Sequence, residues 1–282
     1  MFWQGVVNGF SAGWIYVLVA LGLTLVFGIM RTVQFAHGEV YMLGAHAVFF
    51  ACVVLGINII GAFGIAVVAL FILGMLMERL LFRRFRGQIE PSIIVAIGLI
   101  LLFQTTAVVT FGADEKHIPR FIQGVLVIGG LHIAWDRVLS VIVGAGIMLA
   151  LYAFIKGTKM GQAMIATSQD MDAATLQGVN VNRVSSVSMG IGSALAAVAG
   201  GIMGSIFTVE PFMGSFAITK GLAVIILGGL GSIGGAVIGG LILGLVDGVV
   251  SLYSSSTMAS IVGFALIVLI LIVKPSGLMG GD

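Results

Sequence analysis

The chain contains 282 residues, of which 60% are hydrophobic and 9% charged, and its 13 basic and 11 acidic residues give a net charge of +2. A mean hydropathy of +1.22 predicts an integral membrane protein, because one soluble core cannot bury so much apolar surface, and the small net charge argues against nucleic-acid binding. The first 30 residues contain no Asp, Glu, Lys or Arg, so we expect a retained first span and no cleaved signal peptide.

Charge-free runs define the expected membrane spans, because a helix needs about 20 apolar residues to cross the hydrocarbon. Residues 40–77 are too long for one crossing, and "GINIIG" at 56–61 divides them into two. Residues 211–250 are interrupted by "GGLGSIGG" and are compatible with one tilted helix or two short crossings. Single spans are expected at 5–30, 91–113, 138–155, 184–209 and 257–273. The predicted fold class is all-α: one polytopic membrane helix bundle over residues 1–282, with 8–9 spans and glycine-interrupted helices.

Basic residues give the expected orientation, because short loops rich in Lys and Arg face the cytoplasm. The loop "ERLLFRRFR" at 78–86 is the most basic segment, and placing it inside puts the N-terminus outside. We prefer nine crossings, because a ninth puts the basic C-terminus inside. Nine of the 13 basic residues then share the cytoplasmic side: Arg31, Arg79, Arg83, Arg84, Arg86, Lys156, Lys159, Arg183 and Lys274.

Small residues recur every fourth position in three places, and such ladders let membrane helices approach closely. We interpret them as helix contact faces, either within the chain or toward a second membrane subunit. The three ladders are Gly5, Gly9 and Gly13; Ala196, Gly200 and Gly204; and Gly231, Gly235 and Gly239.

The loop at residues 157–184 has helical periodicity and predicts two short helices. The first covers 160–167, and the second is capped by Asp170, runs through Leu176 and stops at Gly178. Its small side chains suit docking in a groove of another protein, although an interfacial helix lying on headgroups remains an alternative.

Four segments together resemble the Liv-type permease subunit of bacterial branched-chain amino-acid ABC importers. They are "GLTLVFGIMRTVQFAHGEVYMLGA" (22–45), "GQAMIATSQDMDAATLQGVNVNRV" (161–184), "GLAVIILGGLGSIGGAVIGGLILGL" (221–245) and "KPSGL" (274–278). The resemblance spans nearly the whole chain. That family also includes urea and short-chain amide importers, so the resemblance identifies the type of transporter better than it identifies the transported solute. The coupling-loop pattern is more distantly similar to that of ribose-type sugar permeases.

The resemblance implies a type II ABC importer permease fold in the bacterial inner membrane. It also implies four protein partners: a second related permease forming a heterodimer, two ATPase subunits and a periplasmic solute-binding protein. A small-molecule substrate and the lipid bilayer are the other expected partners. This chain would then be a transport subunit with no cofactor and no catalytic residues, while the partner ATPases bind ATP and magnesium. The loop at 157–184 would seat on those ATPases through a coupling surface formed by Gly161, Ala163, Ala166, Asp170, Ala173, Ala174, Leu176, Gly178 and Arg183.

The segment "RTVQFAHGE" at 31–39 concentrates scarce polar groups. One interpretation is anchoring at the membrane surface by Arg31 and by Glu39 at a helix N-terminus. The other is a gate, because paired glycine-interrupted segments point to a transport path. The predicted gate residues are Gln34, His37, Glu39, Gly228, Gly229, Gly231 and Gly235.

Two charged residues, Glu210 and Lys220, are expected near the outer rim, where they would contact the binding protein or the charged groups of an amino acid. Asp247 is interpreted as a helix cap. His46, His117 and His132 lack the spacing of metal ligands, so no metal site is expected. A secondary transporter or channel and a membrane enzyme remain rival functions, and a nucleotide-hydrolysing partner separates the permease from both.

Overall fold

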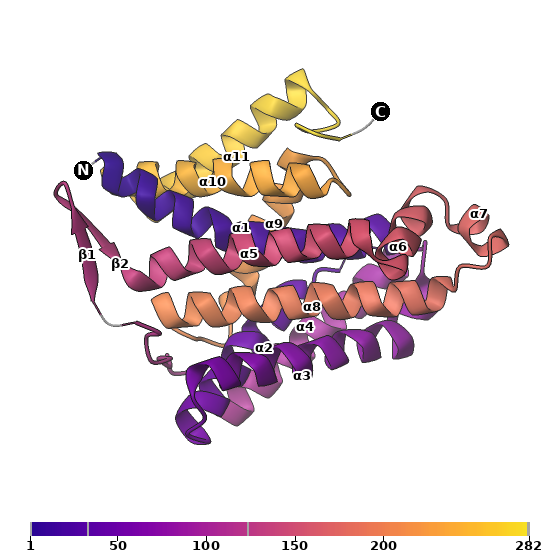
Figure 1. Cartoon of the computed structure of the whole chain (residues 1–282), viewed down its shortest axis with the longest axis horizontal. Helices are drawn as coiled ribbons and strands as arrows, with labels where there is room; N and C mark the ends of the chain where they lie inside the picture. Colours follow the sequence, from indigo (N-terminus) through magenta and orange to yellow (C-terminus); the bar gives the residue numbers. More distant parts are fainter. Residues whose placement is uncertain (1, 33, 123, 281–282) are drawn as a thin grey trace.

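The computed structural model describes residues 2–32, 34–122 and 124–280 and forms a bundle of long helices (Figure 1). The long helices are α1 (Phe2–Met30), α2 (His37–Phe49), α3 (Ile59–Leu80), α4 (Ile89–Phe111), α5 (Trp135–Gly157), α8 (Val181–Ile206), α10 (Ile233–Tyr253) and α11 (Ser256–Val273). Shorter elements are α6 (Lys159–Gln169), α7 (Met171–Leu176), α9 (Met213–Gly228), β1 (Val125–Ile128) and β2 (Leu131–Ala134). A π-helical turn, Phe50–Val54, prolongs α2, and a 3₁₀ turn, Phe82–Phe85, follows α3.

The two ends of the bundle carry different elements (Figure 1). At the hairpin end, β1 and β2 pair antiparallel, with Val125 opposite Ala134. The Gln4 side chain holds this hairpin to α1 through hydrogen bonds of 2.9 and 3.0 Å with the backbone of His132. The opposite end, which we call the α6–α7 end, carries the two short helices. The hairpin was not predicted, because its few residues carry too weak an alternating pattern to stand out within a loop.

The predicted fold class is confirmed. Among the described residues, eight helices are long and apolar enough to cross a membrane, and α9 adds a shorter apolar helix of 16 residues. Every predicted single span matches one helix within a few residues, and the turn at 56–61 separates α2 from α3. The ambiguous stretch at 211–250 forms two helices, α9 and α10, and α1 begins at the opposite end of the bundle from where α11 finishes (Figure 1).

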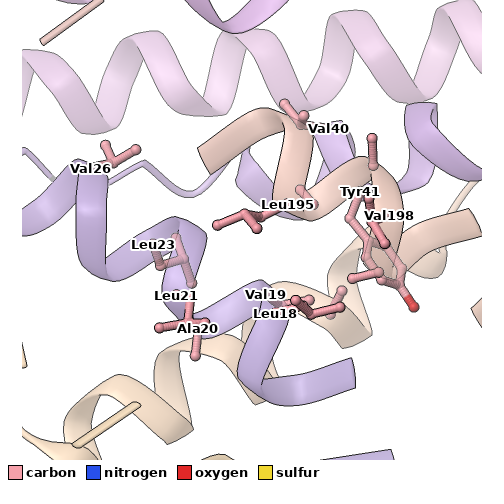
Figure 2. Close-up of a cluster of buried hydrophobic side chains, with 14 of the residues drawn as sticks. Leu18, Val19, Ala20, Leu21, Leu23, Val26, Val40, Tyr41, Leu195 and Val198 are labelled. Carbon is pink, nitrogen blue, oxygen red and sulfur yellow. The ribbon is translucent and has the colours of Figure 1, made fainter. Parts of the chain in front are cut away.

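The core lies around α1 and α8. In their most apolar windows, 89% of α1 and 78% of α8 are buried, against 22% of α3, α4 and α5 and 17% of α11. Figure 2 shows the centre of this core, where α1 side chains such as Leu18 and Leu21 gather with Tyr41 and Leu195. The outer helices expose large apolar side chains instead, as expected for surfaces that face lipid acyl chains.

Most residues of the predicted small-residue ladders lie at contacts between helices. The α1 ladder packs on the backbone of α10, where a Cβ at Gly9 would lie 2.5 Å from the carbonyl oxygen of Gly244. The α8 ladder packs on α2, with Gly200 against Tyr41. The third ladder is only partly right: Gly235 and Gly239 of α10 pack on the end of α9, whereas Gly231 lies in the preceding turn at φ +82°.

Helices α2 and α9 are broken helices that begin inside the bundle. Their first turns touch through the backbones of Gly38 and Gly214, and His37 lies against Gly22 of α1, which also packs on Gly192 near the middle of α8. The chain therefore returns from the end of α1 into the bundle before α2 starts. Discontinuous helices of this kind are characteristic of transporters, where their N-termini meet near the membrane midplane.

Candidate functional site

The loop at 157–184 folds as predicted. Helices α6 and α7 are separated by Asp170, whose Oδ1 accepts hydrogen bonds from the backbone N–H groups of Asp172 (2.9 Å) and Ala173 (3.0 Å). Gly178 follows α7 at φ +84°, a conformation that favours glycine at the end of a helix. Figure 1 shows α7 projecting from the bundle beyond the end of α6.

The predicted coupling residues do not all face outward. Ala173 is exposed, and Leu176 is 87% exposed although it is a large apolar residue. Ala174 is buried beneath α7, and Gly161 is buried where α6 turns against the backbone of Phe154 and Ile155. Ala163 and Ala166 are half-buried, whereas Asp170, Gly178 and Arg183 are exposed. The outward surface of this loop is therefore α7 with its flanking residues, while Gly161 and Ala174 support it from within.

A buried ion-pair cluster fixes the foot of α3 to the start of α8, next to this loop. Glu78 is fully buried and forms ion pairs with Arg83, at 2.8 Å, and with Arg86. Ser186 of α8 donates a hydrogen bond to the same carboxylate. The basic loop at 78–86 was predicted to face the cytoplasm, whereas this role of Glu78 was not predicted; a lone acidic residue among arginines was the available signal.

The predicted gate residues Gln34, His37 and Glu39 are buried inside the bundle, with exposures of 0–2%. Anchoring of Glu39 at the membrane surface is therefore wrong: its carboxylate lies at the first turn of α2, beside Gly214 at the first turn of α9, and accepts a 2.9 Å hydrogen bond from Gln104. Within the described residues, both polar atoms of the Gln34 side chain have no hydrogen-bond partner. Arg31 is exposed and reaches the carbonyl of Gln169 (3.4 Å).

The other predicted gate residues, Gly228, Gly229, Gly231 and Gly235, lie at the α6–α7 end. Gly231 approaches Gly28, six residues beyond Gly22 along α1, so this turn and His37 are separated by about 9 Å along the helix axis. The C-terminal segment closes the turn, because the N–H groups of Leu278 and Met279 donate 2.9 Å hydrogen bonds to the carbonyls of Leu227 and Gly228. The structure therefore does not bring the two halves of the predicted gate together.

Of the predicted rim residues, only Glu210 lies on the surface. Lys220 is 4% exposed and forms an ion pair of 2.7 Å with Asp247, which also accepts a 2.8 Å hydrogen bond from Tyr16. The helix-cap interpretation of Asp247 is wrong, because this residue lies within α10 and its carboxylate is engaged by Lys220. An acidic residue inside an apolar segment was the available signal for a buried charged pair.

A cavity of about 400 Å³ opens beside Asp247 in the hairpin-end half of the bundle. Helices α1, α8, α9, α10 and α11 supply most of its walls, and Arg137 comes from the first turn of α5. No group of three or more His, Cys, Asp or Glu residues in the described part of the chain is arranged to hold a metal ion.

Comparisons with known proteins agree with this architecture. A family model described as the permease component of branched-chain amino acid transport systems matches residues 5–271. The chain is 36% identical to the high-affinity branched-chain amino acid transport system permease protein LivH of Escherichia coli K12, over 99% of this chain and 96% of that protein. It is 33% identical to the corresponding protein BraD of Pseudomonas aeruginosa, over 98% and 95%. A solved structure, PsaBC from Streptococcus pneumoniae in complex with Fab, shares the fold at a TM-score of 0.50 and 16% identity, covering 93% of this chain and 89% of that one.

Proposed function

The chain belongs to the family of permease components of branched-chain amino acid transport systems, and from this membership we propose that it is the membrane-spanning permease subunit of an ABC importer for leucine, isoleucine and valine. The match over residues 5–271 carries this proposal, because it covers the whole helix bundle. Partner ATPases would bind ATP and magnesium. The assembly would contain a second, related permease, two ATPase subunits and a periplasmic solute-binding protein in the bacterial inner membrane.

The distribution of charge supports an orientation with the α6–α7 end in the cytoplasm. The nine basic residues assigned to that side lie in or beside elements at this end, and contacts such as the hydrogen bond from Arg86 to Asn182 (3.0 Å) tie the basic loop to the start of α8. By the positive-inside rule the hairpin end, with the start of α1, would face the periplasm.

The loop that carries α7 is the proposed ATPase contact. Leu176 of this six-residue helix is 87% exposed, so its apolar side chain is available for a partner surface to cover. The Asp170 cap and the packing of Gly161 and Ala174 make the element rigid enough to transmit a movement into α8.

The buried polar residues Gln34, His37 and Glu39 support the proposal of a gate between α1, α2 and α8. A buried polar group without a hydrogen-bond partner costs about 1–3 kcal/mol, so opening this seam to water would recover part of that free energy. The closed seam would then be held by helix packing, and the turn at 228–235 would transmit movement to α9 from the cytoplasmic end.

Reconstitution tests the function directly. The complex of this chain with its partners is placed in proteoliposomes with the binding protein, and ATP-driven uptake of radiolabelled leucine is compared with uptake of urea, acetamide and ribose. We expect leucine uptake that requires ATP. Uptake restricted to urea or acetamide would reassign the solute, and leucine uptake that is indifferent to ATP would favour a channel or secondary transporter.

A further inference from the structure

The cavity in the hairpin-end half of the bundle has the dimensions of a small-solute site. Its volume of about 400 Å³ falls at the lower end of the roughly 300–1,000 Å³ typical of small-molecule pockets. Most of its wall is apolar, with Ile15 of α1, Met203 and Ile206 of α8 and Phe216 of α9 among its lining residues. Such a wall suits a solute with a short branched hydrocarbon group.

An ion pair lies beside this apolar wall. Lys220 Nζ is 2.7 Å from Asp247 Oδ2 and also donates a 3.2 Å hydrogen bond to Ser260, while Tyr16 donates to Asp247. The Lys220 side chain is 5% exposed, whereas that of Asp247 is 14% exposed and lines the cavity. Charged groups inside a membrane bundle are costly, and a pair that served only packing could be replaced by apolar residues, so this arrangement indicates a role in handling a charged solute.

A second charge reaches the cavity from α5. Arg137 lines it, and among the described residues no hydrogen bond or ion pair engages its guanidinium group. The cavity therefore combines a carboxylate that can accept from an ammonium group with a guanidinium that can bind a carboxylate through two parallel hydrogen bonds.

We propose that this cavity binds a zwitterionic amino acid with an apolar side chain, as a binding site within the permease subunit itself. The ammonium group of the solute contacts Asp247, its carboxylate contacts Arg137, and its side chain packs on Ile15, Met203 and Phe216. This inference rests on the proposed transport function and narrows its substrate class. Neither a neutral amide such as urea nor a neutral sugar has charges to match the two groups.

Protection of an engineered cysteine tests occupancy. Cys52 is the only cysteine of the chain, so Cys52→Ser gives a cysteine-free background, in which Ser251→Cys places a thiol at the exposed edge of the cavity. Thr257→Cys, exposed at the same end and outside the cavity lining, is the matched control. The assembled complex is labelled with a maleimide, with and without nucleotide, in the presence of L-leucine, isoamylamine (no carboxylate) or 4-methylpentanoate (no ammonium).

We expect leucine to slow labelling at position 251 at least threefold in one of the nucleotide states, and neither analogue nor the control site to show this effect. Absence of protection in both states would overturn the proposal. Absence of labelling at position 251 while position 257 reacts would also overturn it, because another subunit would then cover the cavity.

Variants that lack the charged groups test whether leucine is recognised through its charges or only blocks access to the thiol. Arg137→Gln should raise the leucine concentration needed for protection about tenfold and make leucine no better than isoamylamine. Arg84→Gln, at an exposed arginine outside the cavity, should leave protection unchanged. Since Asp247→Asn alone would strand Lys220, the double variant Asp247→Asn with Lys220→Met removes the pair together, and in it leucine should do no better than 4-methylpentanoate. Unchanged discrimination in Arg137→Gln would overturn the assignment. If the wild-type complex transports leucine but these variants keep wild-type protection, the proposed binding site is rejected and the proposed transport function is retained. If the wild-type complex transports no leucine, the proposed transport function is itself rejected.

Discussion

The close contact between α1 and α10 allows us to predict how much stability is lost when a single methyl group is added at Gly9. In Gly9→Ala the new Cβ would lie 2.5 Å from the Gly244 carbonyl oxygen and 2.9 Å from Leu245 Cα, whereas relaxed carbon contacts are about 3.5–4.0 Å. The two helices must therefore move apart by about 1 Å. Overpacking of this kind costs about 1–3 kcal/mol, and the better helix propensity of alanine returns up to about 1 kcal/mol, so we expect a net loss of about 1–2 kcal/mol.

Two matched variants turn this expectation into a ranked series. At Gly13 the added Cβ would lie 3.1 Å from the nearest atom, so Gly13→Ala should cost less than Gly9→Ala. At Gly146, on the exposed side of α5, nothing lies within 4 Å, so Gly146→Ala should be neutral or slightly stabilising.

Thermal unfolding of the purified chain in detergent measures the series. For a chain of this size the loss at Gly9 corresponds to a fall in Tm of roughly 2–6 °C. Equal Tm values for Gly9→Ala and Gly146→Ala would refute the reasoning, because they would show that α1 and α10 do not depend on backbone contact.

Three further substitutions test other parts of the bundle. Ala173→Arg adds a long charged side chain to the exposed face of α7 and should weaken retention of the ATPase subunit about tenfold or more in pull-down, with a parallel loss of solute-stimulated ATP hydrolysis. Gly235→Leu should separate α10 from the end of α9, where Gly235 packs on the backbone of Gly228, and lower uptake by the reconstituted complex even where assembly survives. Glu78→Gln should lower the unfolding free energy by about 1–3 kcal/mol in thermal unfolding, because two arginines lose their buried carboxylate.

Each of these has a control at an open position. Ala113→Arg places the same charge on an exposed residue of the hairpin-end loop, and Gly98→Leu adds the same side chain to α4 where nothing lies within 4 Å. Glu90→Gln removes an exposed carboxylate. Normal ATPase retention by Ala173→Arg would favour an interfacial helix over docking. Wild-type uptake by Gly235→Leu, or a Tm for Glu78→Gln equal to that of Glu90→Gln, would contradict the packing and ion-pair roles.

The amino-acid sequence determined the membrane class, the positions of the helices and the form of the α6–α7 loop. These features depend on local properties: the length of an apolar run, the cap supplied by Asp170 and the positive φ available to Gly178. The resemblance carried by four segments identified the permease family, which the match over residues 5–271 confirms. The roles of the coupling and gate residues stay predictions.

The tertiary structure decided which polar residues meet. Lys220 was expected at the rim and Asp247 at a helix end, yet the two are 27 positions apart in the chain and form a buried pair, because α9 starts inside the bundle and runs beside α10. Likewise Glu39 was compatible with the membrane surface until the structure showed α2 beginning against α9, with Gly38 touching Gly214. Periodicity and composition show which face of a helix is apolar. They do not show how far inside the bundle the helix begins, because that depends on the helices packed around its first turn. The positions of Glu39, Lys220 and Asp247 therefore follow only from the packed bundle.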